Sequence, residues 1–151
     1  MRGGTENVAF IGALAERFWD SQDCIEAVLH ICDVSRAFEN ALNESGLDFQ
    51  YNLPPQGRKI VSVRFKGISG GVLVALLSSF GLCVSTGSAC NYGTSEPQKA
   101  LLAMGLTEKQ ARETIRISFS EENTVEEARK AVEIIAEAIH TIERVRNGKA
   151  F

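Results

Sequence analysis

Long apolar runs are missing from this 151-residue sequence. The longest strongly apolar stretch, Val72 to Leu77, is followed by Ser78 and Ser79. A membrane-spanning helix needs about 20 consecutive apolar residues, and the first residues also lack the apolar run of a secretory signal. We therefore expect a cytoplasmic protein that makes no membrane contact.

Clustered basic residues and closely paired cysteines are absent as well. The formal net charge is −3 and the lysines and arginines are scattered, which argues against nucleic acid as a partner. None of the four cysteines forms a Cys-x-x-Cys pair, so we expect free thiols rather than a disulfide framework or a zinc site. Internal repeats and low-complexity tracts are also missing.

Apolar periodicity predicts several helices. Two long ones are expected at the start, from Asn7 to about Asp20 and then to about Ser45, where Gly46 ends the second. Shorter helices are expected from Ser69 to Phe80, after Pro97, and after the capping box Thr107–Gln110. The clearest helix follows the capping box Thr124–Glu127, and its apolar stripe must pack on another element.

Extended segments alternate with these helices. They are expected at 49–52, 60–65, 82–85 and 115–119, with the third of them a short buried strand. The fold class is therefore α/β, with a small sheet of about four strands packed against helices. We interpret residues 1–46 as a helical connector and residues 47–151 as a small domain.

The segment from Ser85 to Pro97 carries the most chemical information. Cys90 stands there among glycine, serine, threonine and asparagine residues, which leave little bulk to bury a thiol. An exposed thiolate in a loop can reach a target as a nucleophile. From the residues alone, two other interpretations stay open: a flexible turn with an incidental cysteine, and an anion-binding nest that leads into a helix.

Three blocks of this region resemble the sulfur-acceptor loop of cysteine desulfurases. They are Ser-Thr-Gly-Ser-Ala-Cys ending at Cys90, Glu96-Pro97, and the Leu-x-Ala-Met-Gly-Leu that ends at Leu106. The likeness is to the group with a long cysteine loop that supplies iron–sulfur cluster assembly. These are pyridoxal phosphate (PLP) enzymes of the class V aminotransferase family, fold type I. The resemblance implies that Cys90 accepts the sulfur of L-cysteine, held on PLP, as a persulfide and leaves L-alanine.

Two further segments are similar to the same family. Arg116, within Thr114–Ser118, matches the arginine that binds the substrate carboxylate, a role that suits its planar fork of donors. Without the resemblance, Arg116 is better interpreted as a surface arginine in an ion pair. Thr5, within the run 2–7, matches the threonine that reaches the PLP phosphate of the partner subunit, and it is also a reasonable helix N-cap.

The sequence also departs from the family. The family's Schiff-base lysine follows a histidine upstream of the segment that matches Thr5, and no lysine of this chain follows a histidine. The resemblance therefore implies that the PLP-binding large domain is missing and that the chain begins near that domain's end. It further implies a chain inactive alone, whose partners are the large domain, a second copy in a homodimer, L-cysteine and a sulfur-acceptor protein.

Two other functions remain open: a cofactor-free persulfide carrier that uses Cys90, and a non-catalytic dimerisation or interaction domain. Among the remaining candidate residues, we expect Cys83 to be core, with a resolving thiol for Cys90 as the lesser alternative. Cys24, His30 and Cys32 have the wrong spacing for a zinc site, and we expect them to sit in a helix and pack in the core or in an interface. His140 is expected to be partly exposed and structural. No metal site is predicted.

Overall fold

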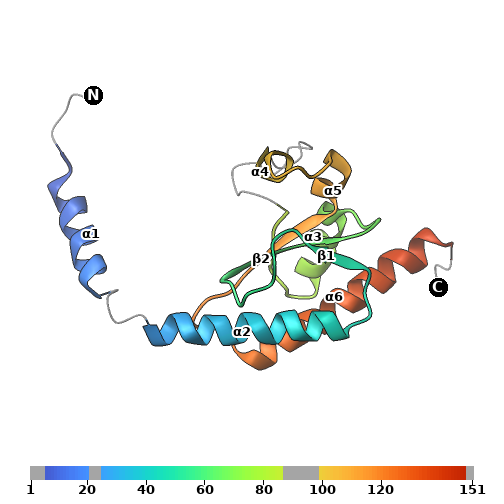
Figure 1. Cartoon of the computed structure of the whole chain (residues 1–151), viewed down its shortest axis with the longest axis horizontal. Coiled ribbons are helices and arrows are strands. Elements are labelled where there is room, and N and C mark those ends of the chain that lie inside the picture. Colours follow the sequence, from blue (N-terminus) through green and yellow to red (C-terminus); the bar gives the residue numbers. More distant parts are fainter. Residues whose placement is uncertain (1–5, 21–24, 87–98, 149–151) are drawn as a thin grey trace.

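The computed structural model of the chain describes residues 6–20, 25–86 and 99–148 (Figure 1). Within these ranges no helix combines the length and the apolarity that crossing a membrane requires. In chain order the elements are α1 (Val8–Asp20), α2 (Ile25–Glu44), β1 (Phe49–Tyr51), β2 (Ile60–Phe65), α3 (Gly70–Ser79), α4 (Lys99–Ala103), α5 (Glu108–Arg112), β3 (Thr114–Ser118) and α6 (Val125–Arg146).

The strands form an antiparallel sheet in the order β1-β2-β3. Val63 of β2 pairs with Ile115 of β3, and both side chains are fully buried. Because side chains alternate along a strand, the next residue on each strand points to the opposite face, and Arg64 and Thr114 share that face. The sheet therefore has one apolar face that joins the core and one polar face.

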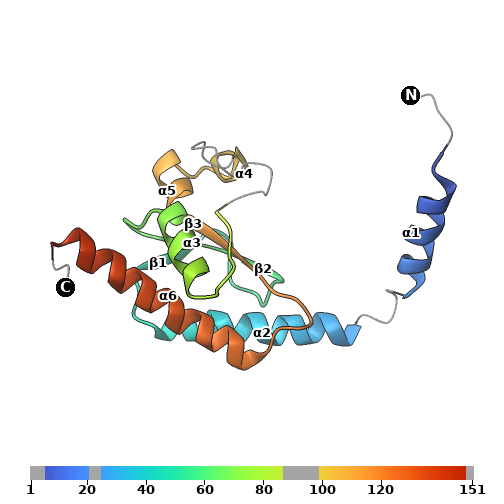
Figure 2. The same ribbon diagram turned by 180° about the vertical axis from the view of Figure 1, so that it is seen from behind.

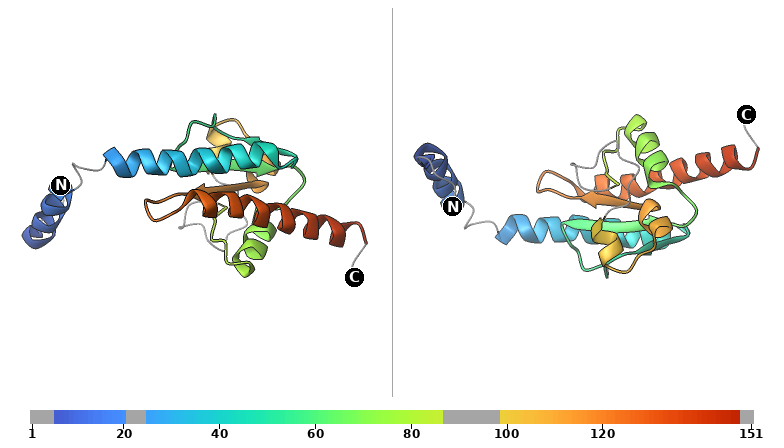
Figure 3. Two further views of the ribbon diagram at one scale, coloured as in Figure 1. Left: turned by 90° about the horizontal axis from the view of Figure 1, so that it is seen from below. Right: turned by 90° about the horizontal axis from the view of Figure 1, so that it is seen from above.

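Helices cover the two faces of the sheet unequally. The longest two, α2 and α6, run beneath the sheet in Figure 1 and pack on each other, and the views in Figure 3 agree. α3 lies beside β3 and α6, as Figure 2 shows from behind. The short helices α4 and α5 lie on the other side of the sheet. The α/β class predicted from the sequence is thus confirmed.

The core lies between α2, α6 and the apolar face of the sheet. Phe38 and Leu42 of α2 are fully buried in the same cluster as Ile135 of α6. Full burial of a side chain of this size stabilises the fold by about 1.5–3 kcal/mol. The C-terminal half of α2 is therefore held in place by the same core as the sheet.

The last helix begins as its sequence predicts. The Thr124 hydroxyl accepts a hydrogen bond from Glu127 N at 3.1 Å, and the Glu127 carboxylate accepts one from Thr124 N at 2.9 Å. Each bond satisfies a backbone donor that the first helical turn leaves unpaired. The predicted capping box is confirmed, and α6 presents a buried stripe consisting of Ala128, Ala131, Val132, Ile135, Ala138 and Ile139.

The start of α3 is packed tightly against β3. Gly70 lies so close that a Cβ atom on it would stand 2.7 Å from the carbonyl oxygen of Thr114 and 3.0 Å from that of Arg112. A glycine at this position lets the helix approach the backbone of the strand. The helix predicted over 69–80 is confirmed, with Ser69 as its N-cap.

The predicted fourth strand at 82–85 is wrong. This segment forms a single bridge, in which Ser85 pairs with Arg116 outside the named strands. Leu82 N instead donates to the carbonyl of Leu77, which closes the end of α3 at 2.9 Å. One pairing at the far side of β3 does not extend the ladder, so the described sheet has three strands.

The N-terminal part of the chain exposes a large apolar surface. On α1, the side chains of Val8, Phe10 and Leu14 are 66–73% exposed. At the start of α2, Ile25 and Leu29 are also mostly exposed. So many exposed large apolar side chains are uncommon in a monomeric soluble protein.

Candidate functional site

Arg116 stands in the middle of β3 on the polar face of the sheet. On one side it pairs with Ser62 of β2, and on the other its backbone bridges Ser85. The alternation predicted for this strand is confirmed, because its neighbours Ile115 and Ile117 are buried in the core. The main chain at Arg116 is therefore held by backbone pairing on both sides of β3.

The Arg116 guanidinium is only partly satisfied. Its side chain is half-buried, and within the described ranges its Nε atom is buried without a hydrogen-bond partner and the side chain makes no ion pair. Burying a donor that stays unpaired costs about 1–3 kcal/mol. The expectation of a plain surface ion pair is therefore not met, and Arg116 retains the capacity to bind an anion.

A small polar network holds the same face of the sheet together. Asn52 Nδ2 donates to the Ser62 hydroxyl at 2.9 Å and to the Thr114 hydroxyl at 3.1 Å. The Thr114 hydroxyl in turn donates to the carbonyl of Gln110 at 2.9 Å. These bonds join the residue that follows β1 to β2, β3 and α5, so the residues that flank Arg116 are held in place.

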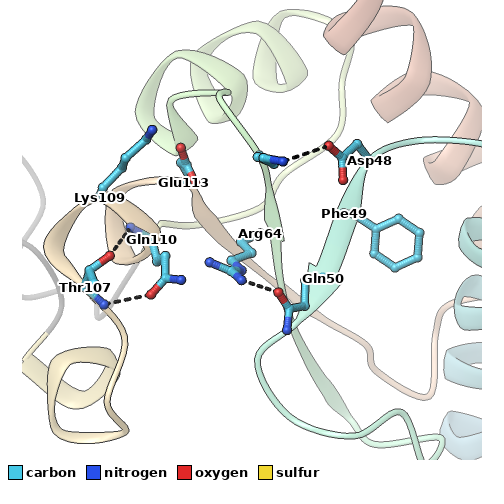
Figure 4. A pocket seen from close by; sticks show the side chains of 9 residues that line it. Asp48, Phe49, Gln50, Arg64, Thr107, Lys109, Gln110 and Glu113 are labelled. Atoms are coloured by element: carbon cyan, nitrogen blue, oxygen red, sulfur yellow. Dashed lines mark hydrogen bonds and ion pairs between the residues drawn. The ribbon is translucent and has the colours of Figure 1, made fainter.

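A polar pocket of ≈ 440 Å³ opens between β1, β2 and α5 (Figure 4). Arg64 and Gln50 reach it from the sheet, and Lys109 and Gln110 from the helix. No sequence pattern predicted this pocket. Alternation along β2 places Arg64 on the polar face, but residues 64 and 110 come to line one pocket only through the tertiary fold, which no local sequence pattern predicts.

Two of the predicted site residues, Cys90 and Thr5, lie outside the described residues. Ser85 and Thr86 are the last described positions before the Cys90 segment, and Ser85 is anchored next to Arg116. The roles of Cys90 as nucleophile and of Thr5 as phosphate ligand stay predictions from the sequence.

The core position predicted for Cys83 is wrong. Its side chain is exposed and borders an open pocket of ≈ 360 Å³ beside α6. Among the described residues the segment 82–85 pairs only through the bridge at Ser85, so Cys83 is not covered by a neighbouring strand there. Lys130 borders the same pocket, but it donates to the Glu133 carboxylate at 2.8 Å, which raises the pKa of that ammonium group.

Three of the other candidate cysteines and histidines, at positions 30, 32 and 140, lie within the described ranges. Cys32 is half-buried in α2, while Cys24 lies outside the described residues. His30 Nε2 bonds the carbonyl of Asn123 at 2.8 Å, which joins α2 to the turn before α6. His140 is exposed on α6 and lies 3.7 Å from the Glu143 carboxylate. Ranges 6–20, 25–86 and 99–148 contain no group of three His, Cys, Asp or Glu side chains arranged to hold a metal.

The one buried carboxylate of α2 organises the turn before β2. Glu39 accepts hydrogen bonds from Gly57 N at 3.1 Å and from Gln56 N at 3.3 Å. The nearby Tyr51 hydroxyl donates to the Glu39 carbonyl at 3.3 Å. Burial, and then the charge of Glu39, raise the pKa of Tyr51 to about 12.

Comparison with known proteins agrees with the resemblance seen in the sequence. Residues 1–130 match the family described as Aminotransferase class-V. The chain is 33% identical to cysteine desulfurase 2 of Trichormus variabilis over 99% of its own length and 39% of that protein's. It is 31% identical to the putative cysteine desulfurase IscS 1 of Bacillus subtilis over 91% of the chain and 38% of the relative.

The fold is similar to that of a solved structure as well. A NifS-like protein superposes with a TM-score of 0.71 and 28% identity, over 93% of this chain and 35% of the other. The chain spans about two fifths of the length of these curated relatives: 39% of the Trichormus variabilis protein and 38% of the Bacillus subtilis protein.

Proposed function

The chain belongs to the aminotransferase class-V family, and we propose that it is the C-terminal part of a PLP-dependent cysteine desulfurase. The complete enzyme converts L-cysteine to L-alanine and leaves the sulfur as a persulfide on Cys90. The observation that carries this proposal is Arg116: a half-buried guanidinium with an unpaired Nε, beside the residue where the chain enters the Cys90 segment.

Arg116 suits the binding of the substrate carboxylate. A guanidinium offers a planar fork of donors that meets the two oxygens of a carboxylate in parallel. Arg116 lacks an ionic partner within the described ranges, so it need not break an existing pair to take the substrate. Its half-buried setting lowers the local dielectric and strengthens the pairing.

Cys90 and Thr5 complete the proposed set of residues. Cys90 accepts the substrate sulfur, and Thr5 contacts the PLP phosphate of the partner subunit. Support for Cys90 comes from the motif around it and from Ser85, five residues earlier in the sequence, whose backbone is tied to Arg116. Ser85 itself therefore lies next to the proposed carboxylate ligand.

The described residues do not fit a PLP site by themselves. PLP supplies the electron sink for the reaction and is held by a lysine in a pocket shielded from water. The lysines in the described ranges are all exposed at the surface, at positions 59, 66, 99, 109 and 130. We infer that the Schiff-base lysine belongs to the part of the relatives' length that this chain does not span.

The exposed apolar surface of α1 and the start of α2 supports a partner. Val8, Phe10 and Leu14 expose about two thirds or more of their side chains, which is unusual for a self-sufficient fold. We infer that the PLP-binding large domain covers this surface and that the assembled enzyme is a homodimer. The sulfur then passes to an acceptor protein for iron–sulfur cluster or thio-cofactor assembly, and we place this activity in the cytoplasm.

A fusion experiment tests the proposal. The chain is joined behind the part of the Trichormus variabilis relative that it does not span, and sulfide release from L-cysteine is measured with PLP and a reductant. We expect release by the fusion but not by the 151-residue chain alone. We expect Cys90→Ala to abolish release and Cys83→Ala, the matched control, to retain it. Release by the chain alone, or full release by the Cys90 variant, would contradict the proposal.

The role of Arg116 has its own readout. In the fusion, Arg116→Lys keeps the charge but loses the fork, so the KM for L-cysteine should rise about tenfold or more. Alkylation of Cys90 by iodoacetamide should proceed at the unchanged rate, because the thiol itself is untouched. Arg144→Lys, at an exposed position of α6, is the control and should leave KM unchanged. An unchanged KM in the Arg116 variant would refute its role.

A further inference from the structure

The pocket between β1, β2 and α5 has donors that face one another without an acceptor. Thr107 N donates to Gln110 Oε1 at 2.8 Å, and Gln110 N donates to the Thr107 hydroxyl at 3.3 Å. This capping box fixes which end of the Gln110 amide faces the helix, because only the oxygen can accept from Thr107 N. The Gln110 amide nitrogen must therefore point away from the helix.

Arg64 lies on the other side of the same space. Figure 4 shows that the Gln110 side chain and the Arg64 guanidinium point toward one another. Within the described ranges Gln110 Nε2 donates to no acceptor, and Arg64 donates only to the neutral Oε1 of Gln50. Two groups that can only donate at their facing ends repel each other unless an acceptor lies between them.

The carboxylates of the pocket do not supply that acceptor. Asp48 lies 4.0 Å from Lys66 Nζ, and Glu113 Oε1 accepts from Gly67 N at 3.0 Å. Lys109, a third cation at this pocket, has no ionic partner among the described residues. Neither carboxylate is therefore bonded to Arg64 or to Gln110, and the pocket is lined by three cations, at positions 64, 66 and 109, against these two carboxylates.

We propose that this pocket binds a small oxyanion, a carboxylate or phosphate group, between Arg64 and Gln110. The Arg64 fork supplies two parallel donors, Gln110 Nε2 a third, and Lys109 adds positive charge at the rim. A volume of ≈ 440 Å³ accommodates a small metabolite that bears such a group. Arg116 lies on the same face of the sheet but is not among the described residues that line this pocket.

The site does not depend on the proposed desulfurase activity, so it is tested on the 151-residue chain itself. Inorganic phosphate and succinate are titrated separately while amide shifts are followed by NMR. We expect saturable shifts at Arg64 and at 107–110 with at least one probe. The probe that saturates at the lower concentration identifies the ligand as phosphate or carboxylate.

Two variants make the test specific. Arg64→Gln should weaken binding at least about tenfold, because it removes the fork. Gln110→Glu retains the capping box, in which glutamate is a preferred residue, and places a carboxylate oxygen against Arg64. It should abolish oxyanion binding without lowering the melting temperature.

The matched controls are Arg144→Gln and Gln56→Glu, which make the same changes of charge at exposed positions outside the pocket. Both should bind the probe as the wild type does. The proposal is overturned if neither probe produces saturable shifts in the wild type. It is equally overturned if the Arg64 or the Gln110 variant binds as tightly as the wild type while remaining folded by circular dichroism.

Discussion

Ser85 and Arg116 exchange two backbone hydrogen bonds. Arg116 N donates to the carbonyl of Ser85 at 2.6 Å, and Ser85 N donates to the carbonyl of Arg116 at 3.1 Å. The bridge joins the segment that leads toward Cys90 to the strand that carries the proposed carboxylate ligand. Because both bonds run through the main chain, they constrain position without using either side chain.

This bridge predicts a local difference in hydrogen exchange. The Ser85 amide should exchange with deuterium at least about tenfold more slowly than the Cys83 amide, because a bonded amide must open before it exchanges. Cys83 N makes no backbone bond within the described ranges and serves as the internal control. Amide exchange followed by NMR provides the measurement, and equal rates at the two positions would show that the bridge does not persist in solution.

Neighbouring glycines at the start of α3 provide a matched pair of substitutions. Gly70→Ala should destabilise the chain by about 1–3 kcal/mol, because the new Cβ would stand 2.7 Å from the Thr114 carbonyl oxygen. At Gly71 the nearest atom to an added Cβ is the Ser69 hydroxyl at 3.9 Å, so Gly71→Ala should be neutral or stabilise by up to about 1 kcal/mol. Urea unfolding measures both, and equal effects would contradict the packing of α3 against β3.

Glu39 should contribute to stability through the two amides that it accepts. Glu39→Ala leaves the buried Gly57 N without its carboxylate partner and should cost about 2–3 kcal/mol of unfolding free energy. Glu39→Gln keeps one acceptor oxygen and should cost about half as much. Glu44→Ala, at an exposed position of the same helix, should change stability by less than about 0.5 kcal/mol. If thermal melts rank Glu44→Ala as the more damaging change, the role assigned to Glu39 is wrong.

The raised pKa of Tyr51 predicts that the folded chain loses stability at alkaline pH. Its pKa is raised to about 12 in the folded chain by burial and, second, by Glu39, from an ordinary value of 10.0. The folded state therefore keeps the phenol proton where the unfolded state has lost it. The stabilisation is fully present below pH 10 and is lost as pH rises through about 12.

The size of this effect is modest because the ring is partly solvated. Between pH 10 and 12 the unfolding free energy of the wild type should fall by about 1–2 kcal/mol more than that of Tyr51→Phe. Urea unfolding at a series of pH values gives both curves. Parallel curves would mean that Tyr51 titrates normally in the folded chain.

Local patterns were sufficient for the helices and for the face on which Arg116 stands. Two capping boxes, at Thr107 and Thr124, are present as predicted, because each depends on residues only three positions apart. The alternation of Ile115, Arg116 and Ile117 likewise depends only on the geometry of one strand.

Features that depend on distant segments were not predictable in this way. The apolar residues of 82–85 are typical of a buried strand, but Cys83 is exposed. The bridge at Ser85 is the only strand pairing described for this segment. The facing donors of Arg64 and Gln110 come from elements far apart in the sequence. The Nε atom of Arg116 is buried without a partner because of tertiary packing, which a local sequence pattern cannot predict.

The helix α2 has a mechanical consequence. Its 20 residues include neither glycine nor proline, so it extends about 30 Å without a weak point. One half is clamped in the core by Phe38 and Leu42, and the other half projects Ile25 and Leu29 outward. The helix therefore couples its two halves as a rigid body. A domain bound to the N-terminal half would rotate together with the sheet and with Arg116.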